Sequence, residues 1–352
     1  MSPMTRERSP GGVPGDDVAA YYRRRAEGGT GLLITEGVAI DHPTAVDSPD
    51  VPRLTGEAAV AGWRRVVTEV HAAGGRIVPQ LWHVGPLWGA MGDVDPNLKP
   101  MRPSGLWGLV GRTVYPDSYL DRALVPTAPM TENDIGEVIE AYVRAARTAL
   151  DVGFDGIALH AGHGYLLDAF LWEPTNQRTD RWGGDAARRV AFPVEVVRAI
   201  RREIGPRPPI FYRFSQHKQQ DFGARIADGP RELERILVPL RDAGVDVFDA
   251  SARRFDQPAF DGSELTLAGW AKKLTGAVSM AVGSVGLSTA LREAGTPEPV
   301  GLDGLLRRLD GNEFDLVAVG RLHLADPALA RTVRAGGPLP VFDRAVHEAR
   351  LY

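Results

Sequence analysis

Two histidines and a tyrosine lie close together in the stretch LHAGHGYLL. His160 and His163 are three residues apart, and Tyr165 follows two residues later. Imidazole N–H groups can stabilise negative charge that develops on a carbonyl oxygen, and a phenol hydroxyl can give up a proton. The preceding stretch FDGIALH predicts a buried strand, so the pattern predicts acid–base chemistry at the carboxyl end of that strand.

Two other interpretations of this pattern remain open. The histidines can be structural, with their hydrogen bonds satisfied at the strand end. An H-x-x-H pair can also supply two metal ligands, but the chain has neither an H-x-H nor a helical H-E-x-x-H arrangement. Because no obvious carboxylate would complete the set, no metal site is expected.

Polar and aromatic side chains also lie near the ends of two other hydrophobic stretches. Gln80 and Trp82 close the stretch RIVPQLWH, where an amide suits the edge of a planar heterocycle and an indole can wall a ring pocket or belong to the core. Arg213 lies inside IFYRFS, where a buried guanidinium needs an anionic or acceptor partner. The sequence leaves open whether that partner is a ligand or a neighbouring aspartate.

Two glycine-containing loops near the end of the chain are candidates for binding phosphate. Gly283-Ser284-Val285-Gly286 and Gly320-Arg321 follow the last two hydrophobic stretches. Loops after the last strands of a (β/α)8 barrel commonly bind phosphate groups. The G-x-G-x-x-G motif of a doubly wound dinucleotide-binding fold is not found in the sequence.

Short β-branched stretches alternate with helical periodicity along the chain. Strands are predicted at 31–37, 76–81, 154–160, 210–215, 245–251, 278–284 and 314–320. Helices are predicted at 16–27, 56–73, 131–151, 186–204, 229–243, 265–275, about 300–310 and 325–335, with Thr131 and Asp134 spaced as in a capping box. This alternation predicts an α/β protein, and the counting favours a (β/α)8 TIM barrel over an open sheet.

The barrel is expected to be one domain covering residues 1–352, with a long capping insertion at about 84–128. Seven strands are visible where eight are needed, so the first strand is expected upstream of Met1, and the position of the true start stays open. The insertion contains Trp88 and Trp107 among many prolines and glycines, which suits either a rigid cap or a mobile lid.

The composition excludes several classes of function. The 352 residues include 41 basic and 45 acidic side chains, giving a net charge of −4 that argues against nucleic-acid binding. The chain has no cysteine, so redox chemistry would need a bound cofactor. Neither a stretch long enough to span a membrane nor a secretory signal is visible in the sequence, and we expect a soluble cytoplasmic protein.

Longer motifs resemble the FMN-dependent old yellow enzymes, the NADH:flavin oxidoreductase or ene-reductase family. The similarity extends over nearly the whole chain. It is carried by SPMTRERSP, LLITEG, HAAGGRIVPQLWHVG, LHAGHGYLLDAFLWEPTNQRTDRWGGDAARR and VAVGRLHLADPALA. The resemblance implies a barrel, an FMN cofactor, and reduction of electron-poor alkenes with NADH or NADPH.

The same resemblance assigns cofactor contacts. Thr5 matches the threonine beside the flavin carbonyl, Arg213 matches the arginine near the flavin N1–C2 edge, and Arg321 lies in a phosphate loop. The full set implied to bind FMN is Pro3, Met4, Thr5, Gly37, Gln80, His160, Arg213, Gly283, Ser284, Gly320 and Arg321.

On the substrate side, the resemblance implies that His160 and His163 hold the activating oxygen of an α,β-unsaturated carbonyl or nitro compound. Tyr165 would protonate the α-carbon after hydride reaches the β-carbon, and Trp82 would contact the substrate. The chain departs from the family at Pro86, where a basic residue is expected, and at SQHKQQDFGARIADGP after Arg213. The second departure is expected to shape the pocket rim and to alter the choice of substrate.

Two other functions remain open at this stage. One is a cofactor-free barrel lyase or hydrolase that uses His160, His163 and Tyr165, and the other is an inactive, binding-only homologue. The physiological substrate, the choice between NADH and NADPH, the stereochemistry and the oligomeric state, including a homo-oligomer, stay open too.

Overall fold

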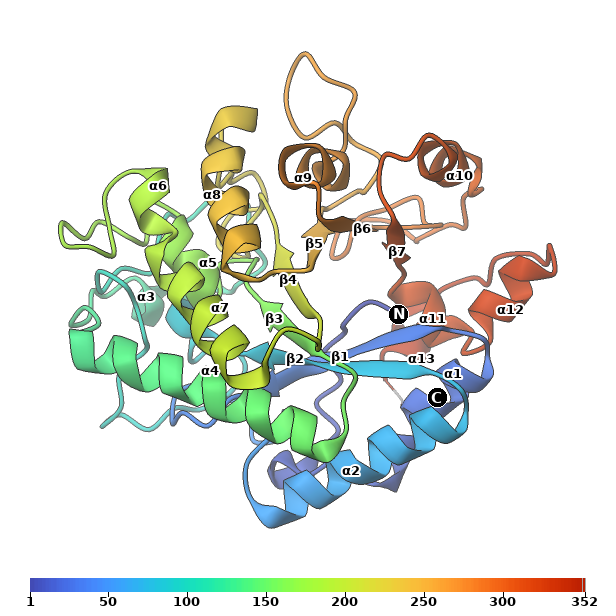
Figure 1. Ribbon diagram of the computed structural model, residues 1–352, viewed down its shortest axis with the longest axis horizontal. Helices are drawn as coiled ribbons and strands as arrows, with labels where there is room; N and C mark the ends of the chain where they lie inside the picture. The colour runs from blue at the N-terminus through green and yellow to red at the C-terminus, as the bar shows by residue number, and fades with distance from the viewer. Residues whose placement is uncertain (350, 352) are drawn as a thin grey trace.

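Within residues 1–349 and 351, which the computed structural model of the chain describes, seven parallel strands form one curled sheet (Figure 1). Each strand pairs with the next in chain order. The strands are β1 (Leu32–Ala39), β2 (Arg76–Trp82), β3 (Ile157–His160), β4 (Ile210–Phe214), β5 (Val247–Ser251), β6 (Val278–Val282) and β7 (Leu316–Ala318). All seven predicted strands are confirmed, and the α/β barrel class with a missing first strand agrees with this topology.

Helices connect the strands and surround the sheet. They are α1 (Asp16–Glu27), α2 (Glu57–Ala72), α3 (Asp117–Ala123), α4 (Glu132–Val152), α5 (Leu166–Leu171), α6 (Ala186–Arg189), α7 (Ala191–Ile204), α8 (Pro230–Ala243), α9 (Leu267–Thr275), α10 (Asp303–Asp310), α11 (Arg321–Ala325), α12 (Leu329–Arg334) and α13 (Arg344–His347), with short 3-10 turns η1 (Pro10–Gly12) and η2 (Gly85–Leu87). No helix among the described residues is both long and apolar enough to cross a membrane.

Local chemistry explains where two of these helices begin. The predicted capping box is present at α4, because Asp134 N donates to Thr131 Oγ1 at 3.1 Å and Thr131 N donates to Asp134 Oδ2 at 2.7 Å. The helix predicted over 186–204 is divided into α6 and α7. Pro193 stands in the first turn of α7 and has no N–H to continue the hydrogen bonding of α6.

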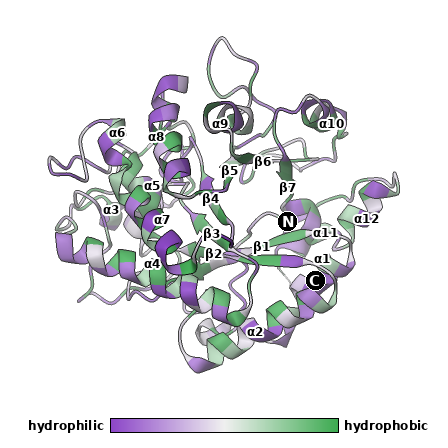
Figure 2. Cartoon of the chain, viewed as in Figure 1, coloured by the Kyte–Doolittle hydropathy of each residue, from purple (hydrophilic) through white to green (hydrophobic). Residues whose placement is uncertain are grey.

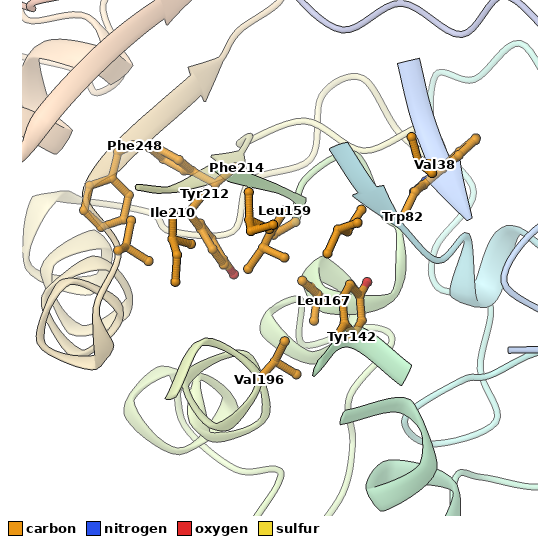
Figure 3. Packing of buried hydrophobic residues seen from close by; sticks show 14 of the residues in the cluster. Val38, Trp82, Tyr142, Leu159, Leu167, Val196, Ile210, Tyr212, Phe214 and Phe248 are labelled. Atoms are coloured by element: carbon orange, nitrogen blue, oxygen red, sulfur yellow. The ribbon is translucent and has the colours of Figure 1, made fainter. Parts of the chain in front are cut away.

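The two faces of the strands carry different cores. Residues turned outward, such as Leu159, Ile210 and Tyr212, pack against helices that include Val196 of α7 and Tyr142 of α4 (Figure 3). The strands are mainly hydrophobic, whereas the helices mix hydrophobic and hydrophilic residues around their axes (Figure 2). The inward residues form a separate apolar cluster of Ile34, Val78, Ala158, Phe211, Val247, Met280, Val282 and Ala318.

The inward cluster determines where the polar site residues lie. Side chains two positions apart on a strand point to the same face. Gln80, His160, Arg213 and Asp249 stand two residues after Val78, Ala158, Phe211 and Val247, so they form a polar layer on the carboxyl side of the apolar one. Strand register places His160 beside Arg213, and Arg213 beside Asp249.

The first two residues lie between the edge strands β1 and β7 (Figure 1). Met1 O accepts a hydrogen bond from Ile34 N at 3.2 Å, and Ser2 N donates to Val319 O at 2.9 Å. These residues therefore satisfy backbone groups on both edges, at the position that an eighth strand would occupy.

The segment 84–128 lies over the loop that follows β4. Its own small core contains Leu87, Trp107, Tyr119, Leu120 and Ala123. Backbone hydrogen bonds join Gly111 N to Gln220 O at 3.1 Å and Phe222 N to Arg112 O at 2.8 Å. The cap is thus fastened to the unusual sequence that follows Arg213.

A buried ion pair fastens the same loop to α5. Lys218 Nζ lies 2.7 Å from Asp168 Oδ1, and neither side chain is exposed to solvent. The second oxygen of Asp168 accepts a hydrogen bond from Gly164 N at 2.6 Å. Removing one partner of such a pair leaves an uncompensated charge in the interior.

We therefore expect Lys218→Met to lower the free energy of unfolding by about 3 to 5 kcal/mol. Urea denaturation followed by circular dichroism measures this loss. Arg23→Met is the matched control. Arg23 pairs with Glu27 and Glu69 at an exposed position, so this substitution should lower the free energy of unfolding far less than Lys218→Met does.

A double variant, Asp168→Asn with Lys218→Met, should regain part of the loss because no buried charge is left alone. If Lys218→Met is no more destabilising than Arg23→Met, the buried pair does not fasten this loop.

Candidate active site

His160, His163, Tyr165 and Trp82 form one cluster of rings where β2 and β3 end. The centroid of the His160 ring lies 5.1 Å from that of His163 and 4.6 Å from that of Tyr165. The Trp82 indole stacks on His160 at 6.0 Å and meets Tyr165 edge-on at 5.0 Å. The fold thus brings together the four residues expected to contact a substrate.

His163 has a left-handed backbone conformation, with φ of 63°. Its N–H donates to Ser215 Oγ at 2.8 Å, its carbonyl oxygen accepts from Gln219 N at 3.0 Å, and its Nε2 lies 2.9 Å from Ser251 Oγ. A non-glycine residue in this region costs about 1–3 kcal/mol and persists where neighbours fix it, typically at functional sites. The loop after β4 therefore sets the direction of this imidazole.

Burial determines the protonation states in the cluster. Burial and, secondly, the charge of Arg213 hold the pKa of His160 well below 6.5. Burial is also the main reason that the pKa of His163 lies well below 6.5, with His217 next in effect. Burial raises the pKa of the Tyr165 hydroxyl. At neutral pH the site therefore presents two neutral imidazoles and a protonated phenol.

The polar layer holds Arg213 between two acceptors. Its NH1 lies 2.8 Å from Asp249 Oδ2, and its NH2 donates to Ser251 Oγ at 3.1 Å. The neighbouring aspartate left open by the sequence is thus present. Within the described residues, Arg213 Nε, Gln80 Nε2 and His160 Nδ1 are buried without a hydrogen-bond partner.

Gly37 is required for the close approach of β1 to Trp82. A Cβ on Gly37 would lie 2.3 Å from Cε3 of the indole. The register of β1 against β2 also shifts between Ile34 and Gly37. Gly37 therefore provides room for the Trp82 ring. Its partner in the strand register is Gln80.

Residues 3–5, which are Pro3, Met4 and Thr5, belong to a segment fastened by a buried carboxylate. Glu36 Oε2 accepts hydrogen bonds from Arg6 N at 2.8 Å and Glu7 N at 3.0 Å. Burial raises the pKa of Glu36 to about 7, although these two N–H groups lower it. Thr5 itself is exposed.

Arg321 presents a buried guanidinium that pairs with no carboxylate in the described chain. Its NH2 donates to Ser284 Oγ at 3.0 Å and to Thr289 O at 2.7 Å, while NH1 is buried without a partner. Burial lowers its pKa to about 10, and Arg344 adds to this effect. A buried cation without a partner is destabilising, so a bound anion would stabilise this guanidinium.

The backbone around Arg321 is shaped for close approach. Gly283 and Ser284 have consecutive positive φ values of 142° and 49°. A Cβ on Gly283 would lie 2.3 Å from Ala252 O, and one on Gly320 would lie 3.3 Å from Met4 Sδ. The two predicted phosphate loops are therefore adjacent, and the segment of residues 3–5 lies beside them.

Three residues near the cluster were not predicted from the sequence as site residues. Ser251 and Asp249 lie on β5 and contact His163 and Arg213. The His217 ring lies 4.9 Å from that of His163, and burial followed by Arg253 lowers its pKa to about 3. The alternation of VDVFDAS would have indicated inward Asp249 and Ser251, but His217 lies in a loop without periodicity.

These groups fit a planar polar heterocycle with a phosphate tail. The unpartnered donors Gln80 Nε2 and Arg213 Nε suit the polar edge of such a ring, and His160 Nδ1, which also has no partner among the described residues, lies beside them. Arg321 and the glycine loops suit the phosphate. FMN has this combination of parts.

Residues 1–339 match the model of the NADH:flavin oxidoreductase / NADH oxidase family. The chain is 31% identical over 354 residues to 12-oxophytodienoate reductase 7 of Oryza sativa subsp. japonica, covering 98% of this chain and 86% of the reductase. It is 32% identical over 323 residues to an NADH oxidase of Thermoanaerobacter brockii, covering 90% of this chain but only 45% of that protein.

Solved structures of related reductases have a similar fold. The structure of morphinone reductase in complex with tetrahydroNAD matches with a TM-score of 0.78 at 29% identity, covering 99% of this chain and 89% of that one. The old yellow enzyme homologue from Zymomonas mobilis matches with a TM-score of 0.76 at 25% identity, covering 97% and 89%.

The lowered pKa values predict that His160 and His163 stay neutral at about pH 5.5, where a histidine with an ordinary pKa of 6.5 is mostly protonated. Side-chain ¹⁵N NMR of the holoenzyme measures this directly, and His160→Asn and His163→Asn assign the two signals. A midpoint near pH 6.5 for either ring would contradict the burial argument.

Proposed function

The chain belongs to the NADH:flavin oxidoreductase / NADH oxidase family, which includes the old yellow enzymes, and from this premise we propose that it reduces the C=C bond of α,β-unsaturated carbonyl or nitro compounds with NADH or NADPH. The enzyme is an FMN-dependent oxidoreductase of the old yellow enzyme type.

One observation carries this proposal. Two neutral imidazoles and a protonated phenol surround the same space beside the polar layer. A cofactor-free lyase or hydrolase would need a base. Burial lowers the pKa values of His160 and His163, which makes these imidazoles weak bases, and it raises the pKa of Tyr165, which makes its phenolate unfavourable. The arrangement suits a reaction in which a carbonyl or nitro oxygen gains negative charge and a carbon gains a proton.

The cofactor is held by the residues with unsatisfied donors. Gln80 and Arg213 would meet the polar edge of the ring system, and Arg321 with the Gly283–Ser284 loop would meet the phosphate. When bound, FMN supplies the chemistry of hydride transfer from a nicotinamide to an alkene. The pair of Arg213 and Asp249 keeps the guanidinium in place on the inner face of β4.

His160 and His163 would hold the substrate by its activating oxygen. Each neutral imidazole has one N–H, and two such donors aimed at one oxygen stabilise the charge that develops on it. His163 is fixed by Ser215, Gln219 and Ser251, so its donor requires little reorganisation during the reaction. Trp82 would support the other side of the substrate pocket.

Tyr165 would give its hydroxyl proton to the α-carbon. The raised pKa keeps the proton on the phenol until a strongly basic carbon develops next to it. The resulting phenolate would regain a proton from solvent, because Tyr165 is only half-buried. Its hydroxyl has no hydrogen bond within the described chain that would compete for this proton.

Anaerobic stopped-flow spectrophotometry tests the proposal by measuring the two half-reactions separately. Wild-type holoenzyme should be reduced by NADH or NADPH and reoxidised by cyclohex-2-enone. His160→Ala should slow reoxidation about 100-fold, because removing one donor to the developing charge costs a few kcal/mol. His160→Asn, which keeps an N–H donor, should retain more of the rate. A reduced wild type that enones do not reoxidise would refute the proposed function.

Tyr165→Phe should slow reoxidation by cyclohex-2-enone about 100-fold or more while leaving reduction by the nicotinamide nearly unchanged. Tyr142→Phe is the matched control, because Tyr142 is buried in α4 away from the cluster. A nitroalkene should be less affected by Tyr165→Phe, since its anion is stable enough to take a proton from water. Equal slowing of both half-reactions would assign Tyr165 a structural role instead.

A further inference from the structure

Ser251, the last residue of β5, contacts one of the two imidazoles of the candidate active site. Its Oγ lies 2.9 Å from Nε2 of His163 and 3.1 Å from NH2 of Arg213. The serine is only 4% exposed, so solvent contributes little to its hydrogen bonding. These two contacts therefore determine where the hydroxyl hydrogen of Ser251 can point.

The contact with Arg213 has only one possible direction. A guanidinium has donors and no acceptor, so Ser251 Oγ accepts this hydrogen bond. The hydroxyl hydrogen then needs an acceptor elsewhere. Within residues 1–349 and 351, His163 Nε2 is the one acceptor at hydrogen-bonding distance from Ser251 Oγ.

The guanidinium that begins this chain of contacts is itself held in place. Arg213 NH1 lies 2.8 Å from Asp249 Oδ2. Asp249 and Ser251 are two residues apart on β5, so they face the same side of the sheet, and Arg213 on the neighbouring strand bonds to both. The hydroxyl of Ser251 is thus oriented by a fixed cation on one side, which turns its hydrogen toward His163.

The position of the proton on His163 follows from this direction. Burial is the main reason that the pKa of His163 lies well below 6.5, with His217 next in effect, so the neutral ring carries one proton. A proton on Nε2 would leave the hydroxyl hydrogen of Ser251 buried without an acceptor, which is unfavourable. With the proton on Nδ1, Ser251 donates to Nε2 and both contacts of the serine are satisfied.

The Nδ1 atom of His163 is then the donor that remains for a ligand. It has no hydrogen bond within the described part of the chain, and it is not one of the buried unpartnered atoms there, so it is accessible. The ring of His160 lies 5.1 Å from that of His163. The N–H that His163 would offer to a substrate oxygen is therefore that of Nδ1.

Different residues hold the ring and the backbone of His163. The backbone N–H donates to Ser215 Oγ at 2.8 Å, and the carbonyl oxygen accepts from Gln219 N at 3.0 Å. Ser251 bonds to the ring alone. A substitution at Ser251 therefore changes the environment of the imidazole while both backbone contacts stay in place.

His160 has no comparable partner. Its Nδ1 is buried without a hydrogen bond among the described residues. The protein's own side chains therefore specify which nitrogen of His163 is protonated, but they do not specify it for His160. His160 serves as an internal reference when the two rings are measured together.

We propose that Ser251 is a positioning residue that fixes His163 as the Nδ1–H tautomer, so that this imidazole presents an N–H donor to the activating oxygen of the substrate. The role toward the substrate rests on the proposed function, whereas the tautomer is a property of the protein alone. The hydrogen bond made by one ring nitrogen sets the protonation of the other, and the wrong tautomer presents a lone pair where a donor is needed.

Long-range ¹H–¹⁵N NMR spectra of oxidised holoenzyme labelled with ¹⁵N-histidine measure the tautomer. Couplings to the two ring C–H protons distinguish Nδ1 from Nε2, and His163→Asn assigns the signals of His163. The wild-type ring should be protonated on Nδ1. Ser251→Ala should lower the Nδ1–H fraction of His163 without changing the tautomer of His160. A wild-type ring protonated on Nε2 would overturn the assignment.

Anaerobic stopped-flow spectrophotometry measures the consequence for the reaction. Ser251→Ala should slow flavin reoxidation by cyclohex-2-enone about tenfold and change reduction by NADPH less than about twofold, because charge develops on the substrate oxygen only during reoxidation. Ser251→Thr, which keeps the hydroxyl, should retain most of the wild-type rate and the Nδ1–H tautomer.

Ser279→Ala is the matched control. Ser279 is a buried serine on the next strand, β6, and its hydroxyl has no hydrogen-bond partner within the described residues. Its replacement should change neither the tautomer of His163 nor the rate of either half-reaction.

A lower Nδ1–H fraction together with slower reoxidation, both restored by threonine, supports the role of Ser251. An unchanged tautomer in Ser251→Ala, a changed tautomer with unchanged reoxidation, or equal slowing of both half-reactions would overturn it. The wild-type spectrum decides the tautomer even if Ser251→Ala does not fold. Because the spectra need no turnover, a holoenzyme that is inert toward enones would refute the proposed function and leave the tautomer result standing.

Discussion

Alternation of side chains along parallel strands is the constraint on which this site depends. In a closed or nearly closed sheet, every second residue must point inward, and the interior can hold only a few layers. Here an apolar layer from Ile34 to Ala318 fills the lower part. The next inward positions are then Gln80, His160, Arg213 and Asp249, and the neighbours of each are fixed by strand register. Polar groups in such a layer must either pair with one another or meet a ligand.

The pattern of satisfied and unsatisfied groups separates structure from function. Arg213 and Asp249 neutralise each other, and Lys218 and Asp168 do the same beneath the loop after β4. His83 is also satisfied, because its Nε2 lies 3.1 Å from His42 Nδ1 and its Nδ1 accepts from Gly85 N at 3.0 Å. By contrast, Gln80 Nε2, Arg213 Nε, His160 Nδ1 and Arg321 NH1 keep unused hydrogen-bonding capacity among the described residues. Under the proposed function, these atoms would meet the cofactor and the substrate.

The loop after β4 connects the interior to the rim. Its Ser215 and Gln219 hold the strained backbone of His163, and its Phe222 donates a backbone hydrogen bond to Arg112 of the cap while its ring contacts the Arg253 guanidinium. Substitutions in this loop would therefore affect both the orientation of His163 and the attachment of the cap.

The sequence alone determined the seven strands, their order and the residues at their carboxyl ends, because hydrophobic periodicity and helix capping are local properties. The spacing of His160, His163 and Tyr165 was also sufficient to indicate a shared site, since all three follow one strand. Only the tertiary structure decided that Asp249 neutralises Arg213, that His217 lies against His163, and that the cap is hydrogen-bonded to the loop after β4. These contacts join loops separated by tens to hundreds of residues, and no local pattern fixes which loops fold over the same end of a barrel.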